Sequence, residues 1–287
     1  MKPKILNIEQ GSQEWLELRS KKITATNIAP IMGLSPYKTA IALWEEKLGF
    51  REPEKANFRM EEGSRLEFVA RDYFNMLHDT DFAPAVLQHG EIDYLMASLD
   101  GINKKGEILE IKCGQGSHDL AKKGVVPEYY LSQLQCQMYC ADTLQAFYFS
   151  YRGDDDNILL VVDRDDDFID KMLVEADKFY KMLVNFTPPT ACDQDFIKRD
   201  SKELKFFIEI WKQTKEELKK LENKDQLLRD TIISMCENQS SECAGVRIAK
   251  QTRRGNVEYG KIAELKNIDL EKYRSKSTTS FRFTEIK

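Results

Sequence analysis

The hydrophobic positions of this chain change their spacing several times, and each spacing predicts a different element. Five segments have apolar residues three and four positions apart, as on one face of a helix: 12–19, 39–48, 61–77, 128–139 and 165–185. Ser12 precedes the first as an N-cap, and Gly49 follows the second as a C-terminal stop. Residues 23–28 are expected to form a polar turn that opens a further short helix. Apolar runs at 145–152 and 158–163 predict two strands.

Two further apolar runs, 96–101 and 106–113, predict a hairpin. They flank Gly-Ile-Asn-Lys-Lys-Gly, a segment rich in turn residues. Because side chains alternate between the two faces of a strand, Glu110 and Lys112 share one face of the second strand. If the strands pair, Asp100 in the first strand returns toward Glu110. The sequence therefore predicts two carboxylates and one ammonium group close together on neighbouring strands.

This group of charges suits metal-dependent hydrolysis of a phosphodiester. Carboxylate oxygens hold Mg²⁺, which keeps several waters and takes phosphate oxygens as further ligands. A lysine beside the metal orients or deprotonates the attacking water. The alternative is that these residues are solvated surface charges, and so short a pattern alone does not separate the two interpretations.

The order of the predicted elements indicates an α/β (α+β) fold with a mixed central sheet flanked by helices. Residues 79–93 carry no predicted element, and residues 114–126 are expected to form a loop. The segment 187–190, Thr-Pro-Pro-Thr, predicts a linker. The chain therefore divides into a core at 1–190 and a C-terminal extension at 191–287.

The extension begins with a long apolar repeat. Its members alternate by steps of three and four, with polar residues at two steps: Leu204, Phe207, Trp211, Thr214, Leu218, Leu221, Asp225, Leu228, Ile232 and Met235. This predicts a long helix over about 196–240, either a coiled-coil-like hairpin arm or a helix that packs on the core. A strand at 246–250, a turn at 253–256, a short helix at 262–266 and a strand at 280–286 are expected to follow.

The end of the extension is basic. Residues 246–287 hold 11 Lys and Arg against 5 Asp and Glu, an excess of 6 positive charges on a chain with a net charge of −5. A local excess of this kind attracts a polyanion such as DNA, because the local potential steers association. A solvated basic surface is the alternative.

The overall composition, 41% apolar and 32% charged, indicates a soluble globular protein. No apolar stretch has the length of a membrane helix, and the first residues lack the apolar core of a signal peptide, so a cytoplasmic protein without membrane contact is expected. The six cysteines have no paired spacing, which predicts reduced thiols rather than a zinc or iron–sulfur site. His78, His89 and His118 follow no pattern that indicates a metal site or a Ser-His-Asp arrangement.

Taken in series, these motifs resemble the YqaJ-type viral recombination exonucleases, the group of phage lambda exonuclease within the PD-(D/E)xK nuclease superfamily. The resemblance covers about residues 8–185. The positions that carry it are Gln10-Gly11, Trp15, Leu18-Arg19, Ile23-Thr24-Ala25-Thr26, Gly63, Glu67, Ala70-Arg71, Ser98-Leu99-Asp100-Gly101, Glu110-Ile111-Lys112-Cys113 and Tyr130-Leu131-Ser132-Gln133-Leu134-Gln135.

The resemblance implies a metal site with two Mg²⁺ ions, which Mn²⁺ would be able to replace. Asp100, Glu110 and the backbone carbonyl of Ile111 would ligate the metal. Glu67 would support the second ion or its water shell. Lys112 would position or activate the attacking water.

The resemblance also implies a site for the end of the DNA. Arg19, Thr26 and Ser98 match positions that bind the terminal 5′-phosphate. Gln133 would orient the water or the scissile phosphate, and Gln135 would contribute to DNA binding. All five positions come from the resemblance and not from the spacing of the residues.

The implied activity is a 5′→3′ exonuclease that degrades one strand of duplex DNA and leaves a 3′ overhang for a single-strand-annealing recombinase. The relatives imply a homotrimer, encoded by a phage or prophage and acting in the bacterial cytosol. Two alternatives stay open: an endonuclease or structure-specific nuclease on the same fold, and a DNA-binding or partner-recruiting module that does not cleave.

Overall fold

The structure is a computed structural model that describes residues 3–52 and 58–251, except for the side chains of 58–61 and 64. Its contacts divide the chain into two compact units, Met1–Lys198 and Arg199–Lys287. None of the helices in the described ranges combines the length and the apolar character needed to cross a membrane.

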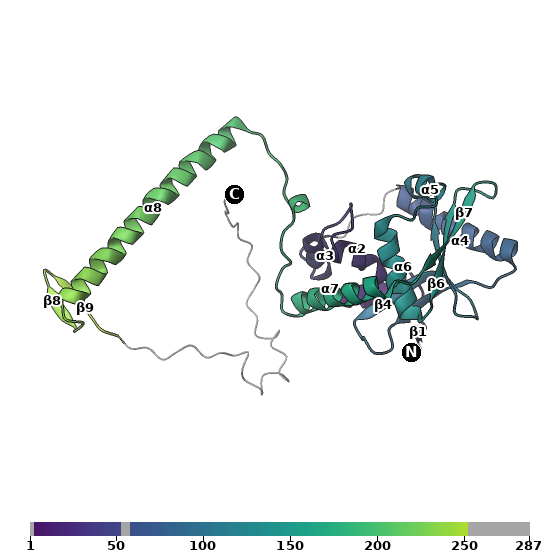
Figure 1. The fold of residues 1–287 in the computed structure, drawn as a ribbon, viewed down its shortest axis with the longest axis horizontal. Helices are drawn as coiled ribbons and strands as arrows, with labels where there is room; N and C mark the ends of the chain where they lie inside the picture. Colours follow the sequence, from purple (N-terminus) through teal and green to yellow (C-terminus); the bar gives the residue numbers. More distant parts are fainter. Residues whose placement is uncertain (1–2, 53–57, 252–287) are drawn as a thin grey trace. The chain divides into compact units, whose positions relative to one another are not determined.

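A seven-stranded mixed sheet forms the centre of the first unit (Figure 1). Its strands are β1 Lys4–Leu6, β2 Ile23–Thr24, β3 Ala83–Gln88, β4 Leu95–Ile102, β5 Ile108–Lys112, β6 Gln145–Tyr151 and β7 Asn157–Asp163. The order is β1-β3-β4-β5-β6-β7, and β2 pairs with β4. β5 runs parallel to β6, and β2 runs parallel to β4, whereas the other pairs are antiparallel. The predicted hairpin and both predicted later strands are confirmed.

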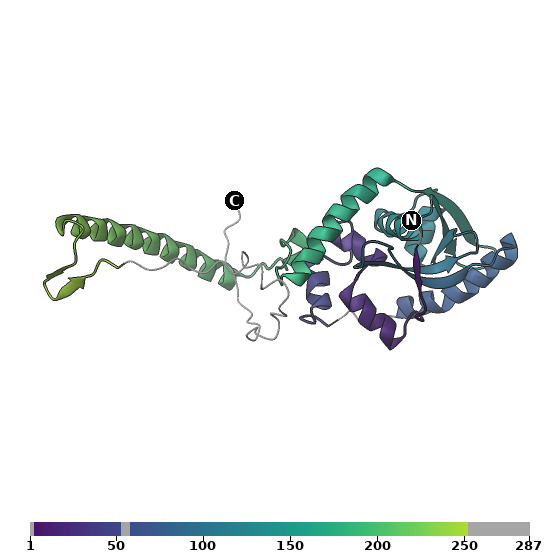
Figure 2. The same cartoon turned by 90° about the horizontal axis from the view of Figure 1, so that it is seen from below.

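Helices cover both faces of the sheet (Figure 2). Helix α4 (Phe58–His78) covers one face, where Phe74 packs with Leu109 and Phe149. Helices α2 (Ile28–Ile31), α6 (Glu128–Ala141) and α7 (Asp166–Val184) cover the other face, in a larger cluster that includes Leu134 and Tyr148. The predicted α/β fold with a mixed, helix-flanked sheet is therefore confirmed.

The remaining short helices of this unit are α1 Gln13–Lys21, η1 Ala25–Asn27, α3 Ala40–Lys47, α5 Gln115–Ala121 and η2 Asp193–Asp195. The hydroxyl of Ser12 accepts a hydrogen bond from the Trp15 amide at 3.2 Å, and Thr39 does the same for Ala42 at 3.1 Å. These bonds satisfy amides that have no partner within the helix. The predicted helices at 12–19 and 39–48 are confirmed.

Three regions differ from the expectation. Residues 79–93 contain β3, whose pairing with β4 shifts register between Ala83 and Ala85, because Pro84 has no amide to donate to the ladder. Residues 114–126 contain α5 and are not a simple loop. Residues 23–28 begin with β2, because β4 supplies a strand partner that the local sequence does not reveal.

The absence of a side chain at Gly101 in β4 leaves room for Phe82, which contacts α4. A Cβ atom at this position would lie 2.9 Å from the Cβ of Phe82, a contact that real Cβ atoms essentially never make. The ring of Phe82 in turn packs edge-on against Phe74 of α4, with 5.6 Å between the ring centroids. A side chain at Gly101 would therefore displace Phe82.

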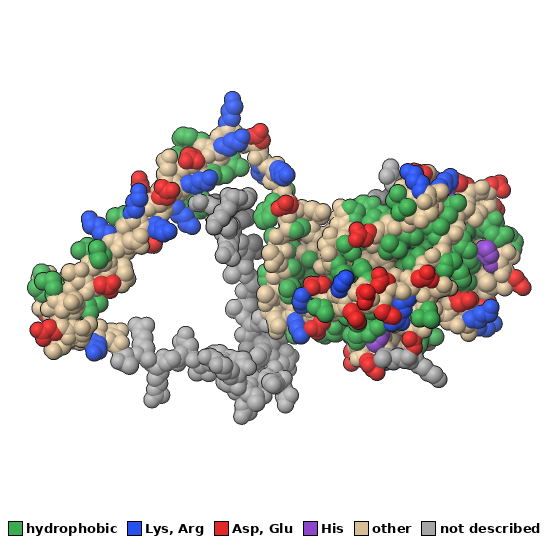
Figure 3. All heavy atoms as spheres, viewed as in Figure 1, with side chains coloured by type: hydrophobic (Ala, Val, Ile, Leu, Met, Phe, Trp, Pro, Cys, Tyr) green, Lys and Arg blue, Asp and Glu red, His purple; other side chains and the backbone are tan. Residues whose placement is uncertain are grey.

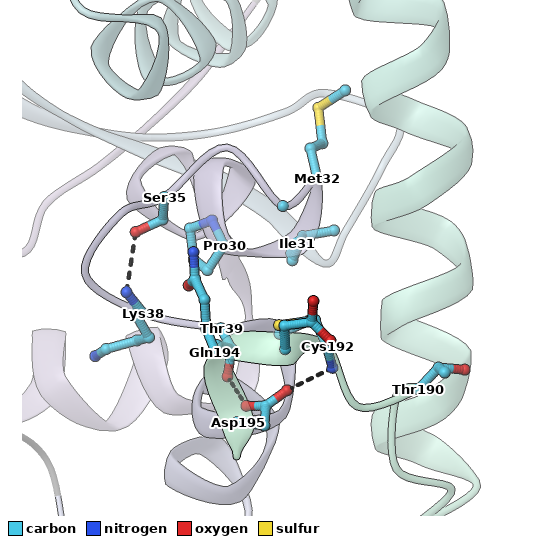
Figure 4. Close-up of a pocket in the computed structure, with 13 residues that line it drawn as sticks. Pro30, Ile31, Met32, Ser35, Lys38, Thr39, Thr190, Cys192, Gln194 and Asp195 are labelled. Atoms are coloured by element: carbon cyan, nitrogen blue, oxygen red, sulfur yellow. Dashed lines mark hydrogen bonds between the residues drawn. The ribbon is translucent and has the colours of Figure 1, made fainter. Parts of the chain in front are cut away.

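The segment after α7 packs back on the first unit and closes a cavity of about 470 Å³ with α2 and α3 (Figure 4). Asp195 holds this segment in place, because its carboxylate accepts hydrogen bonds from the Thr39 hydroxyl at 2.5 Å and from the Cys192 amide at 2.8 Å. The first unit therefore extends beyond the linker that the sequence predicts at 187–190.

The described part of the second unit consists of α8 (Lys202–Met235) and a hairpin of β8 (Ser241–Cys243) with β9 (Val246–Ile248). The predicted long helix and the strand near 246–250 are confirmed. The elements predicted at 253–256, 262–266 and 280–286 lie outside the described residues.

Candidate active site

The hairpin of β4 and β5 stops pairing where the predicted site begins. Gly101 pairs with Leu109, and the next backbone bond is replaced by a side chain: the Asp100 carboxylate accepts a hydrogen bond from the Ile111 amide at 2.8 Å. The carbonyl of Asp100 accepts a bond from the guanidinium of Arg71, on α4, at 2.9 Å. Asp100 is thus fixed by both its backbone and its side chain.

Glu110 lies on the opposite face of β5 from Leu109, and only 1% of its surface is exposed. Its Oε1 accepts hydrogen bonds from the Lys112 ammonium and from the Gln133 amide, the latter at 2.6 Å. Its Oε2 accepts a bond from the Gln137 amide at 2.6 Å. Three donors therefore hold one buried carboxylate. The predicted common face of Glu110 and Lys112 is confirmed.

Lys112 is held between carboxylates and an aromatic ring. Burial alone would lower the pKa of its amine, but the charges of Glu110 and Asp100 outweigh burial and raise that pKa. The ammonium also lies 4.7 Å from the centroid of the Tyr130 ring, within the range of a cation–π contact. Lys112 therefore carries its positive charge in this structure.

Glu67 approaches the same cluster from α4. Its carboxylate lies 3.5 Å from the Arg71 guanidinium, which also holds the Asp100 carbonyl. Burial raises the pKa of Glu67, and the negative charge of Glu110 adds to this, although Arg71 and Lys112 oppose it. The structure thus brings Glu67, Asp100, Glu110 and Lys112 within electrostatic reach of one another.

The carboxylate of Asp100 is the least satisfied of this group. Burial raises its pKa well above the usual value, and the neighbouring charges of Glu110 and Glu67 raise it further, against the attraction of Lys112. In the described part of the chain, the Ile111 amide is its only hydrogen-bond donor. An added positive charge would relieve this repulsion.

The donor set of the cluster fits a hard divalent cation. No three His, Cys, Asp or Glu side chains within the described ranges are arranged to hold a metal as they stand. Mg²⁺ does not require such a cage, because it binds through one or two carboxylates and fills its other positions with water and phosphate oxygens. Asp100 and Glu110, with the carbonyl of Ile111 between Glu110 and Lys112 in the chain, match this requirement.

A second polar group adjoins the cluster. The guanidinium of Arg19 donates to the Thr26 hydroxyl at 2.9 Å and lies 4.6 Å from the centroid of the Trp15 ring. The indole of Trp15 donates to the Ser98 hydroxyl at 3.0 Å. The Gln137 amide donates to the Ser98 carbonyl at 3.1 Å as well as to Glu110, so one side chain links the two groups.

Lys47 supports this second group from α3. Its amine donates to the carbonyls of Arg19 and Lys22, at 3.0 and 2.6 Å. These carbonyls lie at the C-terminal end of α1, where a cation is favourable. Burial, with a contribution from the charge of Arg19, lowers the pKa of Lys47 to about 7. The sequence gives no signal for this residue, because its contacts join helices that are distant in the chain.

The structure does not bring Gln135 to the site. Its amide donates to the Asp163 carbonyl at 2.9 Å and accepts from the Asp165 amide at 2.8 Å, and only 5% of its surface is exposed. Gln137, which the sequence interpretation left out, takes part instead. Because Gln133 and Gln137 are four residues apart, they share one face of α6, and this spacing was the available signal.

A Ser-His-Asp arrangement occurs elsewhere in the first unit. His118 lies 2.8 Å from the Ser150 hydroxyl and 3.0 Å from the Asp156 carboxylate, through its two ring nitrogens. His118 and Ser150 are both 0% exposed, so no substrate reaches the hydroxyl. The three residues join α5 to β6 and to the turn that follows it.

The sheet order, the charge cluster at the end of the β4–β5 hairpin and the position of α6 across it define a nuclease fold of the lambda-exonuclease type. Residues 14–143 match the model of the YqaJ-like viral recombinase domain family, and this confirms the resemblance predicted from the motifs.

Two curated proteins are similar in sequence. An uncharacterized protein of Acanthamoeba polyphaga mimivirus is 30% identical over 156 residues, which cover 48% of this chain and 28% of that protein. The uncharacterized protein YqaJ of Bacillus subtilis is 26% identical over 186 residues, which cover 61% of this chain and 57% of that protein. The matched region therefore spans 28% of the length of the first relative and 57% of the length of the second.

The structure of a known exonuclease resembles that of this chain. It is that of LHK-Exo, an alkaline exonuclease from Laribacter hongkongensis, with a TM-score of 0.54 and 25% sequence identity. Its complex with dAMP gives a TM-score of 0.55 and 26% identity. In both cases, the match covers 61% of this chain and 94% of the exonuclease.

The raised pKa of Asp100 predicts the pH dependence of stability without metal. A carboxyl whose pKa is higher in the folded than in the unfolded state loses stability as pH rises from the unfolded toward the folded value. Asp100→Asn cannot ionise and keeps an oxygen for the Ile111 amide. We expect this variant to melt about 2–4 °C above the unmodified protein at pH 8 in a chelator, which corresponds to about 1 kcal/mol.

This difference should shrink as pH is lowered from 8 to 5, because a raised pKa favours uptake of a proton by Asp100 as pH falls. Melting curves by circular dichroism across this pH range measure it. Asp72→Asn, an exposed change on α4, is the matched control and should show no difference at either pH. Identical pH profiles for Asp100→Asn and the unmodified protein would contradict the electrostatic description of the cluster.

Proposed function

We propose that this protein is a metal-dependent deoxyribonuclease that degrades one strand of linear duplex DNA from its 5′ end. The observation that carries the proposal is the convergence of Asp100, Glu110 and Lys112 at the point where β4 and β5 separate. The YqaJ-like domain and the similarity to an alkaline exonuclease support an exonuclease over other uses of the same cluster.

Asp100, Glu110 and the carbonyl of Ile111 would hold Mg²⁺, or Mn²⁺ in its place, and Glu67 would support a second ion. The bound metal would supply a water of lowered pKa and charge stabilisation for the phosphate. Lys112 would hold and orient the attacking water, since its ammonium already lies against Glu110. Displacement of Lys112 from Glu110 would free one lone pair of Oε1 for the metal, while Gln133 keeps its bond to the same oxygen.

The second polar group would receive the end of the DNA. Arg19 offers a planar cation for a terminal phosphate, and the hydroxyls of Thr26 and Ser98 add donors beside it. Gln137 joins this group to Glu110, so the position of the DNA end would be coupled to the position of the metal.

A polar pocket of about 610 Å³ lies beside the cluster, and Tyr129, Tyr130, Arg152 and Cys113 are among the residues that line it. Tyr130 also underlies the Lys112 ammonium. Aromatic and cationic side chains of this kind suit the bases and phosphates of an unpaired strand.

The proposal extends to partners. A strand degraded from its 5′ end leaves a 3′ overhang, which is the substrate of a single-strand-annealing recombinase. The resemblance to the lambda-exonuclease group supports such a partner, and also a homotrimer of the nuclease unit in the cytosol of a bacterial host.

The direct test is digestion of a linear duplex labelled at either end, with Mg²⁺ and with or without a 5′-phosphate. We expect mononucleotides from the 5′ end of a phosphorylated strand. Asp100→Ala and Lys112→Ala should each reduce the rate at least about a hundredfold, because each removes a group that acts on the metal or the water. Asp72→Ala is the matched surface control.

Other results of this experiment would support other conclusions. Undiminished cleavage by both variants would rule out this site. Cleavage of closed circular duplex would favour an endonuclease, because an end-dependent enzyme has no place to start. Tight, salt-sensitive binding without cleavage in any metal would favour a non-cleaving DNA-binding module.

The two glutamines of α6 give a second prediction. Gln137→Leu removes a donor to Glu110, and we expect the cleavage rate to fall about 10- to 100-fold, as for other residues that support a metal ligand. Gln135→Leu removes two hydrogen bonds to the backbone at Asp163 and Asp165, so it should cost about 1–3 kcal/mol of stability with little change in the rate of the folded enzyme.

Cleavage rates below the melting temperature and urea unfolding curves separate the two effects. An unchanged rate for Gln137→Leu, or an equal loss of rate in both variants, would show that α6 does not position Glu110 in the manner described.

A further inference from the structure

Helix α8 carries a complete seven-residue repeat along one side. Written as a heptad, the a positions are Leu204, Trp211, Leu218, Asp225 and Ile232, and the d positions are Phe207, Thr214, Leu221, Leu228 and Met235. The pattern continues without a break over the helix of 34 residues, which is about 51 Å long. Such a repeat, with charged residues at its central e and g positions, is typical of a coiled coil.

These a and d positions form the seam of the helix, and its apolar residues other than Trp211 are exposed. No residue of α8 is buried, and the exposed fraction of its apolar seam residues reaches 63% at Leu221 and 80% at Met235. Figure 3 shows hydrophobic side chains at the surface at several points along α8, between charged ones. Because exposed apolar area is unfavourable in water, a partner that covers the seam would stabilise the helix.

The two polar seam residues select one arrangement of two such helices. In an antiparallel pair, each a residue faces a d residue of the other helix. If Leu218 faces Leu221 of the second copy, the same register places Thr214 opposite Asp225 of the second copy. A shift by one heptad in either direction would place Thr214 against Leu218 or Ile232. The register that places Thr214 opposite Asp225 avoids this polar–apolar mismatch. In the same register, the two helices overlap over the full length of the repeat.

The charges beside the seam select the same arrangement. In an antiparallel pair, g faces g and e faces e, so Glu217 meets Lys224 and Lys215 meets Glu222 of the second copy. In a parallel pair, g faces e of the next heptad, so Glu217 would meet Glu222. Opposite charges therefore face each other only in the antiparallel pair.

The parallel pair carries a second repulsive contact. Lys224 would lie against Arg229 of the second copy, since these residues occupy successive g and e positions. Such e and g contacts set partner choice and orientation in coiled coils. Both the polar seam residues and the flanking charges thus disfavour the parallel form.

We propose that α8 is a dimerisation arm, in which two copies of this chain form an antiparallel coiled coil centred between Leu218 and Leu221. Each copy supplies both members of every facing pair, as a two-fold symmetric interface requires. The dimer joins two nuclease units, so together with the proposed homotrimer of these units it would link two trimers, and charge reversal in α8 would then halve the mass of the assembly. This assembly does not depend on the proposed activity, because α8 belongs to the second compact unit.

The test is the mass of the full chain by sedimentation equilibrium, with charge reversals at one facing pair. Glu217→Lys places two lysines opposite each other, and Lys224→Glu places two glutamates opposite each other. We expect each variant to dimerise at least about tenfold more weakly, since like charges replace opposite ones at two symmetric sites. Lys224→Glu is the sharper case, because it gains an attractive i,i+4 pair with Lys220 within its own helix.

Complementary variants identify the second copy and its direction. The double variant Glu217→Lys with Lys224→Glu should dimerise like the unmodified chain, and an equimolar mixture of the two single variants should regain the dimer mass. Glu216→Lys makes the same change of charge at an outward f position and should keep the dimer. Circular dichroism checks that α8 stays helical in each variant.

If the charge-reversal variants have the same mass as the unmodified chain, the proposal is overturned, since the seam would then be covered by another segment or another protein. A dimer that is lost in the single variants but not regained in their mixture would overturn the antiparallel register.

Discussion

The burial of the Glu110 carboxylate is the constraint on which the rest of the first unit depends. A buried charge costs several kcal/mol unless donors replace its water. Glu110 meets this requirement with Lys112 from its own strand and with Gln133 and Gln137 from α6. The helix must therefore cross this face of the sheet at a fixed rotation. The parallel connection from β5 to β6 provides the length of chain that places it there.

The two carboxylates of the hairpin have opposite surroundings. Glu110 is fully paired, whereas Asp100 has one amide donor and two acidic neighbours, and its pKa is raised as a result. A cluster built for stability alone would not place Glu67 and Asp100 next to Glu110. Under the proposed function, this arrangement would trade stability of the metal-free protein for affinity toward a cation, as functional sites commonly do.

The sequence predicts the parts of this arrangement that depend on local spacing. The period of two in β5 places Glu110 and Lys112 together, and Ser12 and Thr39 mark where α1 and α3 begin. The heptad repeat likewise predicts α8 correctly. The sequence does not predict β3, because Pro84 interrupts its pattern and its stability comes from β1 and β4 on either side.

Contacts between distant segments explain the other omissions. Gln133, Gln135 and Gln137 are equal candidates until the packing of α6 fixes which side faces the sheet. Packing then turns Gln135 toward the backbone at Asp163, and Gln137 toward Glu110. Lys47 contacts α1 only through tertiary packing, so no local pattern reveals it.

The central claim is that Asp100 and Glu110 form a cation site, and calorimetric titration of Mg²⁺ into metal-free protein at pH 8 tests it most directly. We expect saturable binding that weakens at least about tenfold in Asp100→Asn, because a carboxylate ligand is lost, and that is unchanged in Asp72→Asn. Equal binding by all three proteins, or none by the unmodified protein, would contradict it.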